Sequence, residues 1–202
     1  ARHLCGLAAQ GVRVVAGIDV DPACQYPYEA NHNGAKFLLR DVTTIEGEEL
    51  NSLWSPGVIR LLAGCAPCQP FSSYANTATV DKAKWRLLHE FSRLVDECNP
   101  DLVTMENVPR LQQAQPFKKF LRTLKLAGYH VAYSVLNAAD YGAPQQRKRL
   151  VLVASRIGPV AIPEPTHKGA KNWVTVRQAV GHLQAIKDGE ESTKDSLQIG
   201  RA

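Results

Sequence analysis

Short apolar segments alternate along the chain with segments whose apolar residues recur every three or four positions. Helical spacing is found at residues 85–98 and 117–126, and Pro22 suits the first turn of a helix that ends near residue 31. Runs typical of buried strands occupy residues 12–18, 36–39, 58–63, 101–106, 130–136 and 150–154. The alternation predicts an α/β fold in which a mostly parallel sheet is covered by helices on both faces.

Polar residues follow several of these predicted strands. Asp19 and Asp41 each come directly after one, Glu106 and Asn107 close another, and a turn at residues 64–69 follows a fourth. In open α/β sheets, ligands bind beyond the carboxyl ends of the strands. The pattern therefore predicts one functional region at this edge of the sheet.

The last part of the chain has a different character. Three prolines between residues 158 and 165 predict an extended connector, which a short helix at residues 176–186 follows. Residues 71–84 form a long segment rich in Ser, Thr, Ala and Asn, and long loops of this kind are often mobile lids. We expect a main domain at residues 1–157 and a connector at residues 158–202.

Composition narrows the class of protein. The 202 residues are 45% hydrophobic and 21% charged, which is ordinary for one globular domain, and no apolar run suggests a membrane span. Five scattered cysteines and the lack of a signal-peptide pattern favour reduced thiols in a cytoplasmic protein. The net charge of +5 is compatible with a nucleic-acid partner, although many basic proteins bind none.

Cys68 is a candidate nucleophile, because it follows a predicted strand and turn at the open edge of the sheet. A thiol needs positive neighbours to become a thiolate, and Arg147 and Arg149 could supply them. If Arg149 begins a strand, both arginines point to the same face. Glu106, at the end of another strand, could donate or accept a proton beside the thiol. Together these residues could support covalent catalysis.

Other interpretations of this cysteine stay open from the residues alone. Cys65 and Cys68 form a C-x-x-C, which can be a redox pair or half of a zinc site. No second C-x-x-C or close pair of histidines accompanies it, and a redox pair usually opens a helix in a thioredoxin-like unit. A merely buried thiol is as compatible with the spacing as a nucleophile is.

Asp19 and Asp41 have two interpretations each. They could cap a turn or a helix, as aspartates often do. They could instead bind a nucleotide, with Asp19 accepting hydrogen bonds from ribose hydroxyls and Asp41 from an adenine amino group. Val20 and Val42, next in sequence, could then flank the adenine ring, although Val42 could equally pack in the core.

Four segments together resemble the DNA (cytosine-5) methyltransferases of bacteria. Gly-Cys-Ala-Pro-Cys-Gln-Pro-Phe-Ser at residues 64–72 is similar to the catalytic Pro-Cys-Gln motif of that family, and Glu-Asn-Val at residues 106–108 to its Glu-Asn-Val motif. Residues 145–149 match Gln-x-Arg-x-Arg, and residues 17–22 with 41–42 resemble the strand ends that bind the cofactor. The order and spacing agree over roughly residues 1–185, which makes the resemblance specific.

The resemblance implies a Rossmann-like fold, S-adenosylmethionine as cofactor with S-adenosylhomocysteine as product, and double-stranded DNA as substrate. A cytosine is flipped out of the duplex, and Cys68 adds to its carbon 6 before carbon 5 is methylated. Glu106 binds the ring nitrogen and amino edge, Arg147 holds the base and Arg149 supports the thiolate side. The implied cofactor-binding residues are Asp19, Val20, Asp41, Val42 and Pro67, and the implied substrate-binding residues are Gln69, Ser72, Asn107, Val108 and Gln145; no metal is implied.

Compared with the family, the chain begins after the first strand and its glycine turn and stops before a target-recognition domain. We therefore expect a fragment truncated at both ends, monomeric or joined by a complementing chain if the enzyme is split. A restriction–modification enzyme is the main hypothesis. Since a close relative of the family methylates transfer RNA, an RNA substrate stays open, as does an inactive fragment that binds DNA or a partner.

Overall fold

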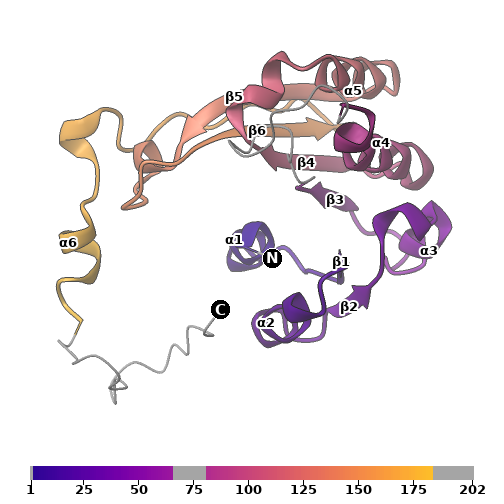
Figure 1. The fold of residues 1–202 in the computed structure, drawn as a ribbon, viewed down its shortest axis with the longest axis horizontal. Helices are drawn as coiled ribbons and strands as arrows, with labels where there is room; N and C mark the ends of the chain where they lie inside the picture. The colour runs from indigo at the N-terminus through magenta and orange to yellow at the C-terminus, as the bar shows by residue number, and fades with distance from the viewer. Residues whose placement is uncertain (1, 66–80, 184–202) are drawn as a thin grey trace. The chain divides into compact units, whose positions relative to one another are not determined.

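The computed structural model describes residues 2–65 and 81–183, apart from the side chains of residues 2–5 and 81–84. The chain divides into two compact units, which are described separately. The first unit comprises Ala1–Leu136 and Lys148–Pro163, and the second comprises Asn137–Arg147 and Glu164–Ala202. Figure 1 shows the helices and strands of both.

The first unit alternates helices and strands, as the hydrophobic pattern predicts. Its helices are α1 (Arg2–Ala9), α2 (Gln25–Asn31), α3 (Gly47–Asn51), α4 (Asp81–Cys98) and α5 (Gln115–Leu126), with 3-10 helices η1 (Pro22–Cys24), η2 (Val42–Thr44) and η4 (Pro109–Gln113). Its strands are β1 (Ala16–Asp19), β2 (Lys36–Leu39), β3 (Leu61–Gly64), β4 (Leu102–Asn107), β5 (His130–Asn137) and β6 (Lys148–Ser155).

Two groups of strands make up the sheet structure of the described residues. β1 pairs in parallel with β2, and a second sheet has the order β3-β4-β6-β5. β3 and β4 are parallel, whereas β6 runs antiparallel to β4. The connection between β5 and β6 contains the 3-10 helix η5 (Ala138–Tyr141) and no crossover helix. Parallel neighbouring strands need a long crossover connection, so this short one is typical of antiparallel strands. The predicted α/β class is confirmed, with a mixed sheet.

Strand boundaries differ most from the prediction at the starts of β1 and β3. The apolar runs at residues 12–18 and 58–63 enter their strands only at Ala16 and Leu61. Val12, Val58 and Ile59 lie in the preceding loops and are 38%, 47% and 64% exposed. An apolar run alone cannot show where the strand begins, because backbone pairing decides it.

α4 joins the two groups of strands through its buried side chains. One cluster packs α4 and α5 on the second sheet, with Phe91 and Phe120 among its members. The other contains Leu94 and Cys98 of α4 together with Ile45 and Leu50. The side chains packed against this second cluster come from β1, β2 and β3 and the segments between them: Ile18, Leu38, Val42, Leu53, Trp54 and Leu62. The two groups of strands therefore share a core beneath α4.

The second unit is organised around Asp140. Its carboxylate accepts a hydrogen bond from Trp173 Nε1 at 2.8 Å, and its carbonyl accepts one from the His167 backbone at 2.8 Å. η6 (Ala170–Asn172) and α6 (Val176–Val180) follow, and a capping box between Thr175 and Gln178 begins α6. The predicted helix at residues 176–186 thus ends earlier, and its last residues lie outside the described part of the chain.

No helix among the described residues is both long and apolar enough to cross a membrane.

Gly64 permits a close contact between β3 and α4. A Cβ atom at this position would lie 2.4 Å from Cε2 of the Phe91 ring, well inside van der Waals contact. Because Phe91 is 8% exposed and packed in the first cluster, its ring has little room to move.

We expect Gly64→Ala to lower the free energy of unfolding by about 1–3 kcal/mol, as overpacked cores do. Gly158→Ala is the matched control, since a Cβ at Gly158 meets no atom within 4 Å, and its effect should stay within about 1 kcal/mol. Urea unfolding followed by circular dichroism measures both. Equal stability of the two variants would contradict the predicted clash.

Candidate functional site

A carboxylate, a guanidinium and a thiol meet at the carboxyl end of β3 and β4. Glu106 Oε1 lies 2.9 Å from Arg149 Nε in an ion pair, and Glu106 Oε2 accepts a hydrogen bond from Cys65 Sγ at 3.2 Å. The register explains this meeting. Gly64 of β3 is opposite Met105 of β4, so Cys65 and Glu106 are the next residues on neighbouring strands. Arg149 comes from the first residues of β6, which pairs with β4 from its other side.

Both oxygens of Glu106 therefore have a donor. The side chains of Arg149 and Glu106 are 26% and 23% exposed, which leaves the pair accessible while much of each is shielded from water. Arg149 Nη1 also donates to the Lys148 carbonyl at 2.8 Å, which restricts the guanidinium further. A charge-assisted pair of this kind orients a carboxylate for proton transfer or for binding a polar ring edge.

Asn107 and Val108 continue from β4 into a turn. Asn107 is 4% exposed, and its Oδ1 accepts a hydrogen bond from the Val108 backbone at 2.8 Å. Val108 in turn precedes the first residue of η4. The described contacts thus give Asn107 a role in shaping the strand end, and substrate binding by these two residues stays a prediction.

Asp19 is the last residue of β1, and Asp41 follows the neighbouring strand β2 after one residue; each also anchors the loop that follows it. Asp19 Oδ1 accepts from the Asp21 backbone at 3.1 Å, and Asp41 Oδ1 accepts from the Thr43 backbone at 2.9 Å. The Thr43 backbone N–H is the main reason that the pKa of Asp41 lies below its usual value. The capping interpretation is therefore observed at Asp41, and these bonds hold both carboxylates in defined orientations.

The two valines beside these aspartates differ. Val20 is 62% exposed, which is unusual for an apolar side chain at a strand end. Val42 packs partly against the second core cluster, as the alternative interpretation expected. Val20 is an exposed apolar side chain next in sequence to the exposed carboxylate of Asp19, and such a pair fits the edge of a nucleoside, which offers a flat ring and several hydrogen-bond donors.

The remaining predicted residues are not part of this cluster as described. Gln145 and Arg147 belong to the second unit, where the Gln145 backbone donates to Ala143 and the Arg147 carbonyl accepts from Ala138. Pro67, Cys68, Gln69 and Ser72 lie outside the described residues. The roles predicted for these six residues remain predictions.

Cys65 is a member of the site that the sequence patterns did not single out. They marked it only as the first residue of a C-x-x-C. The signal available in the sequence was its place directly after β3, one strand away from Glu106. Among the residues that the structure describes, no group of His, Cys, Asp and Glu could hold a metal ion.

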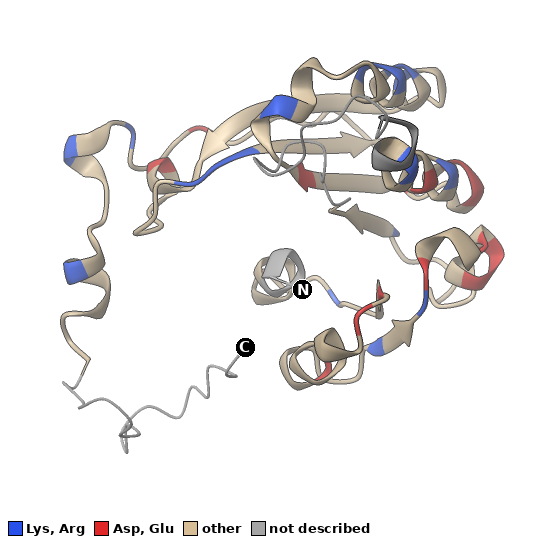
Figure 2. Ribbon diagram, in the orientation of Figure 1, with Lys and Arg blue, Asp and Glu red and all other residues tan. Residues whose placement is uncertain are grey.

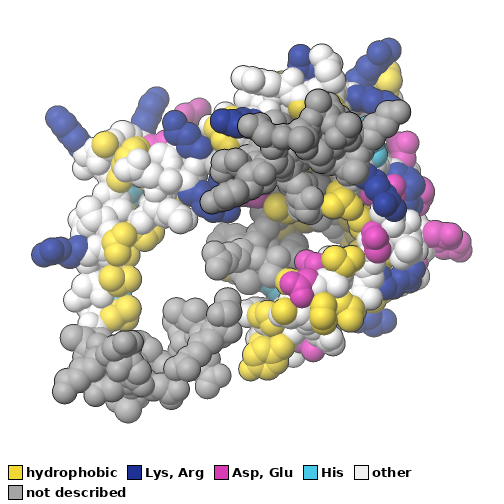
Figure 3. Space-filling model, in the orientation of Figure 1, with side chains coloured by type: hydrophobic (Ala, Val, Ile, Leu, Met, Phe, Trp, Pro, Cys, Tyr) yellow, Lys and Arg dark blue, Asp and Glu magenta, His cyan; other side chains and the backbone are white. Residues whose placement is uncertain are grey.

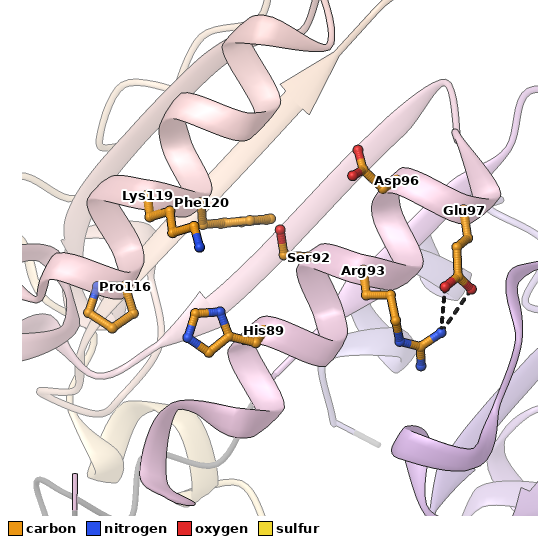
Figure 4. A pocket seen from close by; sticks show the side chains of 8 residues that line it. All are labelled: His89, Ser92, Arg93, Asp96, Glu97, Pro116, Lys119 and Phe120. Atoms are coloured by element: carbon orange, nitrogen blue, oxygen red, sulfur yellow. Dashed lines mark hydrogen bonds and ion pairs between the residues drawn. The ribbon is translucent and has the colours of Figure 1, made fainter. Parts of the chain in front are cut away.

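One hollow formed by described residues lies away from this cluster. It has a volume of about 350 Å³ and is lined by α4 and α5 (Figure 4). Its lining includes His89, Asp96 and Lys119, and none of the predicted site residues. Lys and Arg dominate α5 and acidic residues α3, whereas α4 carries both signs (Figure 2). The face shown in Figure 3 has the same mixture, so charge alone does not mark a DNA-binding surface there.

Comparisons with known proteins identify the family. Residues 4–199 match the family model described as C-5 cytosine-specific DNA methylase. The Type II methylase M.HgiDII of Herpetosiphon aurantiacus is 43% identical over 195 residues, covering 95% of this chain and 54% of that protein. The Type II methyltransferase M.XorII of Xanthomonas oryzae pv. oryzae is 35% identical over 187 residues, covering 88% and 43%.

A solved structure supports the fold. The putative DNA modification methyltransferase encoded within prophage Cp in E. coli superposes with a TM-score of 0.70 at 23% identity, over 90% of this chain and 52% of that chain. This likeness confirms the predicted methyltransferase fold. The chain spans about half the length of these two curated relatives and of a third, the Type II methyltransferase M1.HphI of Haemophilus parahaemolyticus.

Cys65 and Cys98, two of the described cysteines of the first unit, have different surroundings and should differ in reactivity. Cys65 is exposed, whereas Cys98 is 1% exposed and burial raises the pKa of its thiol to about 11. We expect iodoacetamide at about pH 8, below that pKa, to alkylate Cys65 in the native protein and to spare Cys98. Peptide mapping by mass spectrometry measures both, with a sample unfolded in urea as the control in which both react. Equal rates of alkylation of Cys65 and Cys98 in the native protein would contradict the burial of Cys98.

Proposed function

The chain belongs to the family of C-5 cytosine-specific DNA methylases, and we propose that it forms the catalytic centre of an enzyme that methylates carbon 5 of cytosine in double-stranded DNA. The observation that carries this proposal is the carboxylate of Glu106, held by Cys65 and Arg149. It lies at the end of the strand that neighbours β3, and β3 leads into the segment with Cys68. A proton-transferring group thus lies beside the end of β3, after which the sequence continues to the proposed nucleophile.

S-adenosylmethionine is the proposed cofactor, since it supplies the methyl group of this reaction. Asp19 and Asp41 would accept hydrogen bonds from its ribose and adenine, and Val20 would contact the ring. Val42 and Pro67 complete the proposed set. The capped carboxylates and the exposed Val20 support this assignment, because they offer acceptors and an apolar surface at the carboxyl edge of two parallel strands.

The proposed reaction begins outside the DNA stack, because carbon 6 of a stacked cytosine cannot be reached. The Cys68 thiolate forms a bond to carbon 6, which breaks the carbon 5–carbon 6 double bond, and the electron pair of that bond makes carbon 5 nucleophilic. Glu106 binds the ring nitrogen and the amino edge of the cytosine, which favours electron flow toward carbon 5. Arg147 holds the base. After methylation, loss of the carbon 5 proton restores the double bond, and the sulfur–carbon bond breaks to release the thiolate.

Arg149 has a defined part in this proposal. Its ion pair keeps Glu106 in place, so that the carboxylate faces the bound base in one orientation. Gln69, Ser72, Asn107, Val108 and Gln145 are the proposed contacts to the flipped nucleotide and its DNA strand.

The biological setting follows from the relatives. Two of them are named Type II methylases or methyltransferases, which favours DNA over RNA and a restriction–modification context. We propose a cytoplasmic enzyme that acts as a monomer, or with a complementing chain if the enzyme is split. Transfer RNA stays as the alternative substrate, to be tested in the same assay.

Duplex DNA that carries 5-fluorocytosine tests the covalent step. Fluorine at carbon 5 cannot leave as a proton does, so the enzyme should remain attached to the DNA in the presence of S-adenosylmethionine. We expect a band that migrates as a protein–DNA adduct in denaturing gels, and none with Cys68→Ser. A Cys65→Ser variant controls for loss of any nearby thiol and should still form the adduct. Adduct formation by Cys68→Ser would overturn the mechanism, and adducts with transfer RNA alone would move the substrate to RNA.

Glu106→Gln should slow adduct formation on the order of 100-fold, because the amide cannot exchange a proton with the base. Glu48→Gln is the matched control, since Glu48 lies exposed in the first turn of α3, and its rate should equal that of the wild type. Single-turnover time courses measure both rates. An unchanged rate in Glu106→Gln would remove Glu106 from the proposed mechanism.

A further inference from the structure

Arg93, on α4, contacts the turn that follows Asp41. Its Nη2 donates to the carbonyl of Ile45 at 2.9 Å and to that of Val42 at 3.3 Å. Arg93 is 48 to 51 positions away from these residues in sequence, so the contact is a tertiary one. Ile45 itself is 1% exposed, which places this turn partly in the core.

Two carboxylates on α4 hold the guanidinium in this position. Arg93 Nη1 donates to both oxygens of Glu97 at 2.8 Å, and Arg93 Nε donates to Glu90 at 2.7 Å. Figure 4 shows Arg93 and Glu97 facing one another along α4. Glu97 also accepts a hydrogen bond from the Gly47 backbone at 2.8 Å, at the start of α3. The network therefore makes hydrogen bonds to the backbone both in the turn, at Val42 and Ile45, and just after it, at Gly47.

Arg40 holds the same turn from the end of β2. Its Nη2 donates to the Thr44 carbonyl at 2.6 Å, and its Nη1 pairs with Glu49 at 2.9 Å. Within the turn, the Thr44 backbone and hydroxyl both donate to the Asp41 carbonyl at 2.9 Å. Four carbonyls of the turn, at Asp41, Val42, Thr44 and Ile45, thus have donors.

This arrangement has a consequence for Asp41. Its carboxylate is oriented by the Thr43 backbone, so any shift of the turn moves the carboxylate with it. Surface ion pairs contribute little by themselves. Here, however, the guanidinium satisfies backbone carbonyls beside a buried residue, and loss of such donors leaves acceptors unpaired. The turn would then be free to adopt other positions.

We propose that Arg93 is a positioning residue for the cofactor, which holds the Asp41 turn in the conformation that binds the adenine end of S-adenosylmethionine. This inference rests on the proposed function, since it assumes that Asp41 is a cofactor-binding residue. A lysine could not fully replace Arg93. The planar guanidinium bonds two carbonyls and two carboxylates at once, and a single ammonium group cannot reach all four.

Isothermal titration calorimetry with S-adenosylhomocysteine as the probe tests the inference on the whole chain. We expect Arg93→Gln to weaken binding about tenfold or more, which corresponds to the loss of a hydrogen bond to a charged group. The affinity of Arg93→Lys for the probe should lie between those of the wild type and Arg93→Gln. Asp41→Ala, which removes the proposed acceptor itself, should weaken binding at least as much as Arg93→Gln.

Arg60→Gln is the matched control. Arg60 also donates to backbone carbonyls, those of Cys98 and Asn99 at the C-terminal end of α4, and lies 3.8 Å from the Asp101 carboxylate. Its other side-chain partner is Asn51, so its hydrogen bonds among the described residues do not include the turn after Asp41. We expect Arg60→Gln to lower the melting temperature as Arg93→Gln does and to leave the probe affinity unchanged. Hydrogen exchange in a peptide that covers residues 41–47 should quicken about tenfold in Arg93→Gln only.

The outcomes separate the inference from the proposed function. Weaker binding and faster exchange in Arg93→Gln, with Arg60→Gln like the wild type, would support the inference. Wild-type affinity in Arg93→Gln, together with weak binding in Asp41→Ala, would overturn the inference alone. Equal weakening in Arg93→Gln and Arg60→Gln would show that stability, and not the turn, decides binding. A wild-type chain that binds no probe would overturn the proposed cofactor site and the inference with it.

Discussion

The packing of α4 is the constraint on which the rest of the first unit depends. In the described residues, no strand pairing joins the β1–β2 pair to the four-stranded sheet. Instead, Phe91 packs against Gly64 and the first cluster, while Leu94 and Cys98 enter the second. The strand ends with Asp19 and Asp41 and the strand end with the proposed catalytic carboxylate therefore both depend on α4 for their positions. A change in the tilt of this helix would move them relative to each other.

The polar contacts of α4 add precision where apolar packing cannot. Hydrophobic burial is not directional, whereas hydrogen bonds to carbonyls specify distance and direction. Arg93 therefore determines the position of the turn more narrowly than Ile45 does by burial alone. At Glu106 the same logic applies, since Arg149 and Cys65 fix the carboxylate that burial leaves about a quarter exposed.

Much of the fold and part of the site could be predicted from the sequence. The strand at residues 36–39 and the positions of Asp19, Asp41 and Glu106 at strand ends follow from local hydrophobic patterns and one rule of parallel sheets. α3 was missed, because Gly-Glu-Glu-Leu-Asn is short and carries no periodic apolar face. The contacts of Cys65 with Glu106 and of Arg93 with Ile45 were also missed. They depend on strand register and helix docking across 41 and 48 positions, for which no local pattern exists.

The aspartates show why a single residue can satisfy two interpretations at once. A capping bond uses one carboxylate oxygen, Oδ1, and it comes from the backbone of the same loop. Such a bond restricts rotation of the side chain and lowers the proton affinity of Asp41, so the group stays charged and directed. Both effects improve an acceptor for nucleoside hydrogens. The capping role therefore does not compete with the proposed binding role, because the cap prepares the carboxylate that binding would use.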